Sequence, residues 1–293
     1  MHLWRAVGMA VAAIATGVAS MQARAPVYDG SISPLGHPTY NESHALYLAR
    51  LCAVSYCKHD HVEKWTCSPC AFVSRPQHLH IIADVKENFQ GIVGYSGTDI
   101  VIAFRGSMDV KNWLDNLSFL KTRPWAALPD VYVHQGFYWV YESIAKQLLT
   151  AVRKLRESYP QAPIVVTGHS LGAAVAAITT VDLATSHNIT VRQLVTFGEP
   201  RVGTKSFVAH LLSIVPYLAR VTHWRDIVPH VPFHWLGYVH GPQEIWYAED
   251  SAIYKLCDPT DGEDAQCNNQ FRATASIADH LVYLNISMSH LLC

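Results

Sequence analysis

One serine lies between two glycines in the segment Gly168-His-Ser-Leu-Gly172, a pattern that could present a nucleophile. The segment follows a run of β-branched residues and precedes an alanine-rich stretch, so it joins a predicted buried strand to a predicted helix. The glycines avoid Cβ clashes in the tight turn that such a junction needs. The N-terminus of the helix would direct backbone N–H groups and a partial positive charge toward Ser170. The pattern therefore predicts Ser170 as a nucleophile rather than an ordinary turn residue.

A serine nucleophile needs a base, and the base needs an acid that orients it. In this strand–turn–helix context the expected chain order is Ser, Asp, His. Asp226 is the favoured acid because it directly follows a predicted strand, at the edge where parallel sheets present reactive groups. His280 is the favoured base, late in the chain, and Glu199 is the alternative acid. The alternative bases are three loop histidines and the neighbour of the serine: His230, His234, His240 and His169.

The oxyanion that forms during acyl transfer needs preorganised donors. One donor is expected to be the backbone N–H of Leu171, the residue after the nucleophile. The second must come from the end of an earlier strand, and the segment Ile102-Ala-Phe-Arg-Gly-Ser107 is such an end. Gly106 permits a close backbone approach there, so Ser107 is the predicted second donor.

These residues must be positioned by the elements around them, which alternate between strands and helices. The predicted helices cover residues 43–57, 137–155, 171–186 and 204–214. The predicted strands cover residues 78–85, 90–96, 99–104, 163–167, 191–197, 217–224 and, as the last strand of the chain, 244–248. This alternation predicts an α/β protein with a central, mostly parallel sheet flanked by helices on both faces. Without any linker, residues 26–293 are expected to form one domain.

Composition and the N-terminal segment limit the classes of binding partner and indicate the compartment of the protein. Of the 293 residues 50% are hydrophobic and 15% are charged, and the net charge of −1 excludes a nucleic-acid footprint. An apolar run from Ala6 to Ala19 follows Arg5 and precedes small residues, which predicts a secretory signal peptide over about residues 1–25. The run is shorter than a membrane span, and we expect the mature protein to have no transmembrane segment and to be secreted.

Seven cysteines in a secreted chain predict disulfides with one thiol left over. Six cysteines can pair in 15 ways, so the residues alone leave the partners open. The spacing of Cys67 and Cys70 lacks the second ligand pair of a zinc site, and no metal is expected. Four sequons agree with secretion and would make the protein a glycoprotein: Asn41, Asn116, Asn188 and Asn285.

A set of motifs along the mature chain resembles the fungal-type class 3 triacylglycerol lipases. The matching segments are Ser55-Tyr-Cys57, Trp65-Thr-Cys-Ser-Pro-Cys70, Phe104-Arg-Gly-Ser107, Asn112-Trp113, Val133-His-Gln-Gly-Phe137, Thr167-Gly-His-Ser-Leu-Gly172, Gly198-Glu-Pro-Arg-Val-Gly203, Arg225-Asp-Ile-Val-Pro-His230 and Asp279-His-Leu-Val-Tyr283. The resemblance implies an α/β-hydrolase fold, the triad Ser170, Asp226 and His280, the oxyanion donors Ser107 and Leu171, and no cofactor.

The same resemblance implies a disulfide pattern: Cys57–Cys293, Cys67–Cys70 and Cys257–Cys267, with Cys52 as the odd thiol. Two positions depart from the family. Ala173 replaces a frequent third glycine of the turn, which should be tolerated. Glu199 replaces a small or amide residue, and a carboxylate there could perturb nearby titrations.

A short amphipathic segment follows Ser107. Its apolar residues Val110, Trp113, Leu114 and Leu117 fall on one face at helical spacing. This segment resembles the mobile lid of the family, whose apolar face covers the triad in water. The alternative is a surface helix packed permanently on the core.

The expected function is therefore that of a secreted, monomeric triacylglycerol lipase that acts at an oil–water interface. Within the family, the alternatives are a phospholipase or lower-glyceride lipase and a feruloyl or acetyl esterase. A remote alternative is an inactive binding or storage protein with a lipase fold, because fold does not fix function.

Overall fold

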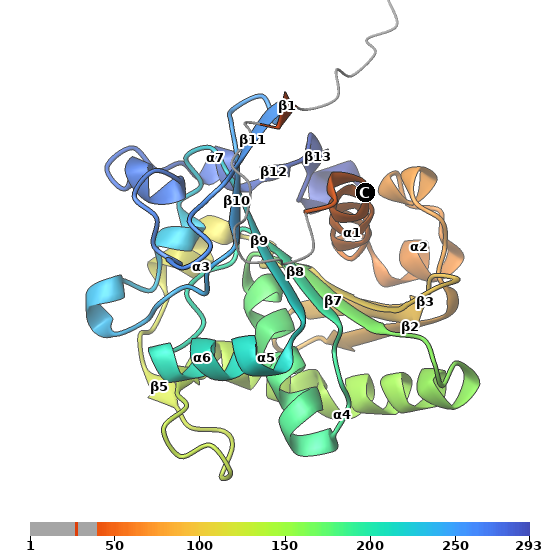
Figure 1. Cartoon of the computed structure of the whole chain (residues 1–293). Coiled ribbons are helices and arrows are strands. Elements are labelled where there is room, and N and C mark those ends of the chain that lie inside the picture. The colour runs from red at the N-terminus through yellow and green to blue at the C-terminus, as the bar shows by residue number, and fades with distance from the viewer. Residues whose placement is uncertain (1–26, 29–39) are drawn as a thin grey trace, which may run out of the picture.

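A nine-stranded, twisted sheet forms the centre of the described part of the chain (Figure 1). The computed structural model describes residues 27–28 and 40–293, so the predicted signal peptide lies outside the described residues. In sheet order the strands are β1 (Val27–Tyr28), β11 (Ile253–Leu256), β10 (Glu244–Tyr247), β9 (Tyr217–His223), β8 (Gln193–Phe197), β7 (Ile164–His169), β4 (Ile100–Phe104), β3 (Phe89–Tyr95) and β2 (Gln77–Asp84). The run from β10 to β4 is parallel, and antiparallel pairs occur toward both edges.

Helices cover both faces of this sheet. They are α1 (Glu42–Val54), α2 (His59–Lys64), α3 (Val110–Asp115), α4 (Gln135–Ser158), α5 (Leu171–His187), α6 (Lys205–Ile214) and α7 (Ile277–His280). In Figure 1, α4, α5 and α6 lie below the sheet and α1 lies above it. Two short strand pairs complete the fold: β5 (Lys121–Thr122) with β6 (Val133–His134), and β12 (Val282–Tyr283) with β13 (Ile286–Ser287).

Two hydrophobic cores result, one on each face of the sheet. Successive side chains of a strand point to opposite faces, so Val166 of β7 packs in the core under α4 and α5 while Val165 packs in the core under α1. The central strands are therefore apolar without interruption, as expected of a parallel sheet covered on both faces. Helix α5 is buried along most of its length, and its alanines allow it to lie close to the sheet.

The predicted fold class is confirmed, and the predicted helices and central strands lie within a few residues of the observed ones. The prediction that residues 244–248 form the last strand is wrong. Strand β11 follows β10 and pairs antiparallel to it, and β12 and β13 come later still. Strand β11 is partly exposed and the other two strands have two residues each, so none has the buried apolar run on which the prediction depended.

Three disulfides occur among the described residues: Cys57–Cys293, Cys67–Cys70 and Cys257–Cys267. They are the three pairs that the resemblance implies. Cys52 is the free cysteine and is buried, beside the hydroxyl of Thr167. Burial raises the pKa of the Cys52 thiol to about 12, so it stays protonated and behaves as a small core residue.

The disulfides should differ strongly in their effect on stability. Cys57–Cys293 spans 236 residues and Cys67–Cys70 spans 3. In the loop-entropy model the first contributes about 5 kcal/mol and the second about 2 kcal/mol to the free energy of unfolding. We therefore expect Cys293→Ser to lower the melting temperature more than Cys70→Ser, as measured by calorimetry. Equal losses in the two variants would contradict this expectation.

Candidate active site

Ser170 lies at the sharp turn between β7 and α5 in a backbone conformation that few residues adopt, with φ 59° and ψ −128°. The turn is crowded by backbone. A Cβ on Gly168 would come within 2.2 Å of the carbonyl oxygen of Gly172, and one on Gly172 within 2.4 Å of the carbonyl oxygen of Arg105. The glycines are therefore required, whereas Ala173 is accommodated as a buried residue of α5. This geometry places the buried serine side chain at the carboxyl end of the sheet.

Asp226 and His280 are brought together by a bridge between their segments. Asp226 follows β9, and its backbone pairs in parallel with Ser276, whose hydroxyl caps α7. The Nδ1 atom of His280, the last residue of α7, then lies 2.8 Å from Oδ2 of Asp226, and both side chains are fully buried. The carboxylate thus fixes the imidazole so that Nε2 is the nitrogen left for proton transfer.

Two further donors hold the carboxylate of Asp226. The hydroxyl of Tyr283 donates to Oδ2, and the backbone N–H of Val228 donates to Oδ1 over 2.8 Å. Burial raises the pKa of Tyr283 well above its ordinary value, so this hydroxyl keeps its proton. An acid with this many donors stays oriented while the imidazole beside it changes charge.

Ser170 Oγ and His280 Nε2 are both buried and have no hydrogen-bond partner among the described residues. Buried polar atoms are normally paired, so these two stand out. Unpaired atoms are expected of the predicted nucleophile and the predicted base, because the hydrogen bonds of such groups are often loose before substrate binds.

The two predicted oxyanion donors lie on either side of the serine. Leu171 is the first residue of α5, where backbone N–H groups have no partner within the helix. Ser107 is half-buried and follows Gly106, whose Cβ, if present, would lie 2.5 Å from Cβ of Ser170. The strand end that carries Ser107 is therefore in contact with the nucleophile.

The alternative bases have other roles. The ring of His240 bonds to the carbonyl of Pro229 over 2.8 Å, and His234 is exposed. Burial lowers the pKa of His230 to about 4, and its ring nitrogens make no hydrogen bond. His169 leaves the turn on the far side and bonds to Tyr56 and to the carbonyl of His280. None of these four rings shares the hydrogen bond that joins His280 to Asp226.

The sequence and the fold are similar to those of known proteins. A family model described as "Lipase (class 3)" matches residues 101–235. A lipase of Rhizomucor miehei is 31% identical over 269 residues, which cover 88% of this chain and 72% of the relative. The chain belongs to the class 3 lipase family.

Solved structures agree with this membership. A Rhizomucor miehei triacylglyceride lipase superposes with a TM-score of 0.75 at 30% identity, covering 86% of this chain and 98% of that one. Another, described as a triacylglycerol lipase whose catalytic centre is a serine protease triad, gives a TM-score of 0.76 at 29% identity, with 85% and 96% covered. A secreted mono- and diacylglycerol lipase of Fusarium solani is 36% identical over 172 residues, 57% of this chain and 50% of the relative.

In this lipase the predicted lid segment forms α3. Asp109 caps the helix by accepting from the N–H of Asn112. Val110 is buried, and Trp113 and Leu117 pack against the main core, where the indole stacks on Phe137 at 6.1 Å. Leu114 is half-buried beside them, whereas the polar residues face outward. The apolar face is thus turned inward, as the sequence pattern predicts for either a closed lid or a permanently packed helix.

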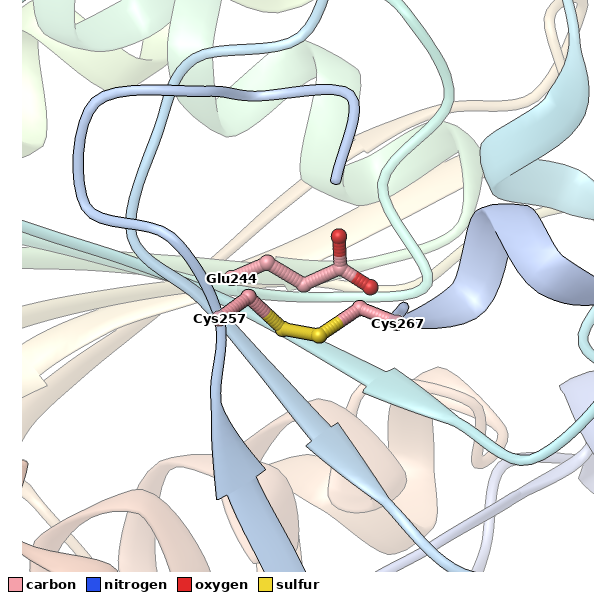
Figure 2. Close-up of side chains that lie close together, drawn as sticks. All are labelled: Glu244, Cys257 and Cys267. Atoms are coloured by element: carbon pink, nitrogen blue, oxygen red, sulfur yellow. A yellow bond between two sulfur atoms is a disulfide. The ribbon is translucent and has the colours of Figure 1, made fainter. Parts of the chain in front are cut away.

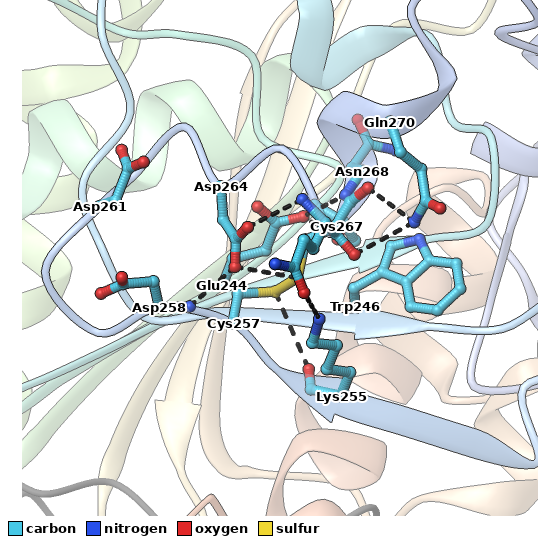
Figure 3. Close-up of a disulfide and its surroundings, with 12 residues drawn as sticks. Glu244, Trp246, Lys255, Cys257, Asp258, Asp261, Asp264, Cys267, Asn268 and Gln270 are labelled. Atoms are coloured by element: carbon cyan, nitrogen blue, oxygen red, sulfur yellow. Dashed lines mark hydrogen bonds between the residues drawn. A yellow bond between two sulfur atoms is a disulfide. The ribbon is translucent and has the colours of Figure 1, made fainter. Parts of the chain in front are cut away.

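A layer of polar residues below Asp226 was not predicted. The amide of Asn268 donates to the carbonyls of Trp224 and Asp226, at 3.3 and 3.2 Å. Glu244 accepts from the N–H of Asn268 and from the hydroxyl of Thr222. Figure 3 shows Glu244 and Asn268 beside the Cys257–Cys267 disulfide, which fixes the loop that precedes Asn268. The side chain of Tyr283, which also contacts Asp226, does stand in a motif of the family, Asp279-His-Leu-Val-Tyr283.

Glu244, Cys257 and Cys267 lie close enough together to suggest a metal site (Figure 2). Their donor chemistry does not fit one, because each sulfur is bonded to the other and neither can act as a thiolate ligand. The Glu244 carboxylate is also occupied by its two hydrogen bonds and by Arg220 at 3.6 Å. These residues therefore form a structural support for the acid.

Glu199, the alternative acid, is buried at the end of β8 rather than joined to a histidine. Burial raises its pKa to about 7, against the opposing effect of Arg220. A carboxyl whose pKa is higher in the folded protein than in the unfolded chain stabilises the fold at low pH and loses that contribution as pH rises. The loss occupies the window from about 4.5 to about 7.

We therefore expect Glu199→Gln to become more stable than the wild type as pH rises. The gain in the free energy of unfolding should be small at about pH 5 and approach roughly 3 kcal/mol at about pH 8. Urea denaturation at the two pH values measures it. Glu263→Gln is a matched control, because bonds to Arg201 lower the pKa of Glu263. The free energy of unfolding of Glu263→Gln should fall below that of the wild type by about the same amount at both pH values. A gain for Glu199→Gln that does not change with pH would contradict the assignment.

Proposed function

We propose that the protein is a secreted triacylglycerol lipase that cleaves carboxylic esters through Ser170, His280 and Asp226. One observation carries the proposal most directly. The serine hydroxyl at the strained turn and the free nitrogen of an aspartate-bound histidine are both buried and unpaired. Family membership supports the same assignment, because a lipase needs a serine nucleophile activated in this way.

The reaction follows from the roles of these atoms. Ser170 Oγ attacks the ester carbonyl carbon while His280 Nε2 takes the hydroxyl proton. The negative charge on the former carbonyl oxygen is stabilised by the donors at Leu171 and Ser107. His280 then returns the proton to the alcohol that leaves, and an acyl-enzyme remains. Water, deprotonated by the same nitrogen, releases the fatty acid and restores the serine.

Helix α3 would control access as a lid. Its apolar face covers the core beside the site, so exposing it costs free energy in water and is favoured at an oil surface. Ser107 lies three residues before α3, so opening the lid would also place this oxyanion donor. Action at an oil–water interface is therefore part of the proposal.

Secretion is supported by the N-terminal signal pattern, by the three disulfides and by the secreted Fusarium solani relative. No helix in the described part of the chain is long and apolar enough to cross a membrane. We further propose that residues 26–293 act as one domain and as a monomer, which size-exclusion chromatography would test.

A mono- and diacylglycerol lipase is the second candidate. The Fusarium solani protein of that description is 36% identical to this chain over 172 residues, a match that covers 57% of this chain and 50% of the relative. The two candidates share the triad and differ in how the lid and its surroundings admit substrate. Comparing hydrolysis of emulsified triolein, diolein and monoolein distinguishes them.

Replacing the triad should abolish activity without unfolding the protein. Ser170→Ala should lower kcat roughly 10⁴- to 10⁶-fold, because triad members act as a unit. Its hydroxyl has no hydrogen bond to lose, so the melting temperature should be unchanged. His280→Ala should lower kcat similarly, and Asp226→Asn by about 10⁴-fold.

The matched control is His230→Ala, which removes a half-buried histidine that makes no bond to the acid. It should retain most of the activity. A loss as large as that of His280→Ala would show that the base is assigned wrongly. A phosphonate inhibitor should label Ser170, and peptide mapping that finds another residue would refute the nucleophile.

A lid formed by α3 predicts that activity depends on whether the substrate is dissolved or emulsified. Activity on tributyrin should rise sharply once emulsion droplets form, and Trp113→Ala should blunt this rise more than it reduces hydrolysis of a soluble ester. Leu212→Ala, an exposed apolar residue of α6, should leave the rise unchanged. Simple saturation through the solubility limit, with rapid turnover of methyl ferulate, would favour the feruloyl esterase alternative.

A further inference from the structure

Four segments around the nucleophile are joined by one chain of buried hydrogen bonds. The backbone N–H of Gly106 donates to the hydroxyl oxygen of Tyr56 over 2.9 Å. That oxygen lies 2.6 Å from Nδ1 of His169, and Nε2 of His169 lies 2.9 Å from the carbonyl oxygen of His280. Tyr56 is 3% exposed and His169 is fully buried. The proposed reaction mechanism uses neither side chain.

The direction of each hydrogen bond in this chain is fixed. The carbonyl of His280 can only accept, so Nε2 of His169 carries a proton and donates it. Tyr56 already accepts from Gly106, so its own proton is free to point to Nδ1 of His169. His169 must then be neutral, and burial does lower its pKa well below the ordinary value. Every donor and acceptor in the chain is used once.

Both ends of the chain belong to loops that carry reacting groups. Gly106 immediately precedes Ser107, and a Cβ on Gly106 would lie 2.7 Å from the Tyr56 hydroxyl and 2.5 Å from Cβ of Ser170. The glycine is thus wedged between the tyrosine and the nucleophile. At the other end, the ring of His169 stacks on the ring of His280 at a centroid distance of 4.5 Å. These hydrogen-bonded residues therefore contact both the proposed oxyanion loop and the proposed base.

The backbone on either side of Tyr56 is held by hydrogen bonds and by a disulfide. The amide of Gln90 donates to the carbonyls of Ser55 and Cys57, on either side of the tyrosine, at 3.0 and 2.8 Å. Cys57 is also bonded to Cys293. A hydroxyl held this firmly can set the position of a neighbouring loop rather than follow it.

We propose that Tyr56 and His169 are positioning residues of the reaction, a relay that holds the oxyanion loop at Gly106–Ser107 and the base His280 at fixed distances from Ser170. This inference rests on the proposed function, since it assigns Ser107 and His280 the roles given above. The relay makes no hydrogen bond to Ser170 Oγ or to His280 Nε2. It therefore acts on the transition state, where the oxyanion and the imidazolium form together, and not on substrate binding.

The first test is Tyr56→Phe, which removes the hydroxyl and keeps the ring. On a soluble p-nitrophenyl ester we expect kcat to fall about 10- to 100-fold, part of the effect of losing an oxyanion donor, with KM changed less than about twofold. Tyr141→Phe is the matched control, because Tyr141 is also buried and its hydroxyl donates to Asp182, far along α5. That variant should keep the wild-type kcat. An unchanged kcat in Tyr56→Phe, or an effect confined to KM, would overturn the relay.

The second test asks whether the two residues act together. His169→Phe keeps the stacked ring and removes both nitrogens, so it should lower kcat by a similar factor. In the double variant Tyr56→Phe/His169→Phe, kcat should fall by about the same factor as in either single variant. Either substitution already interrupts the series of hydrogen bonds, so the second adds no further effect. Two losses that multiply would show independent packing effects and overturn the relay.

The third test needs no substitution. In the ¹⁵N NMR spectrum of the wild-type protein, His169 should appear as the neutral tautomer protonated at Nε2, from about pH 5 to about pH 9. An Nδ1-protonated ring, or one that titrates near its ordinary pKa, would overturn the relay.

The kinetic results distinguish failure of the relay from failure of the proposed function. If wild-type hydrolysis proceeds while Tyr56→Phe is fully active, the relay fails and the proposed function stands. If the wild type hydrolyses no ester, both fail.

Discussion

The backbone strain at Ser170 is the constraint on which the rest of the site depends. A serine with a positive φ is costly, and it persists only where the surrounding structure leaves no alternative. Here β7 delivers the chain into the turn and α5 leaves it, while both flanking glycines lie against backbone that admits no side chain. The parallel register of β4 with β7 also sets how close the strand end at Gly106 comes to the serine. The packing of one helix against a sheet therefore fixes the position of Ser170 and of the strand end at Gly106, which carries the proposed oxyanion donor Ser107.

Asp226 shows how a buried charge can be kept in place. Its carboxylate accepts from His280, Tyr283 and Val228, and its own carbonyl accepts from Asn268. Unpaired, such a charge would cost several kcal/mol, whereas this set of donors repays the desolvation and fixes its direction. Glu244 and the Cys257–Cys267 disulfide lie one layer further from the substrate and support the same segment. The acid is thus stabilised by residues far apart in the sequence.

Sequence reasoning found what is encoded locally. The turn at Ser170 has a strand before it, glycines in it and a small-residue helix after it, and the face of α4 repeats with helical spacing from Phe137 onward. The placement of Asp226 after β9 and the inward face of α3 could be predicted for the same reason. Partly exposed strands such as β11, and partners such as Asn268, have no local signature, because β11 lacks a buried apolar run and the contact of Asn268 with Asp226 joins residues 42 apart in the sequence. Tyr56 stands in a motif that was recognised, but its role depends on contacts with segments that fold beside it.

The Cys57–Cys293 bond turns most of the folded chain into a covalent ring. A protease that cuts any loop between these residues opens the ring at one point and releases nothing. The two pieces stay joined, and the helix-covered sheet keeps them in register. Such a nick would leave the mass on a non-reducing gel unchanged and show only after reduction. If the enzyme is secreted as proposed, the first cut by an extracellular protease would therefore leave both pieces attached to the folded protein.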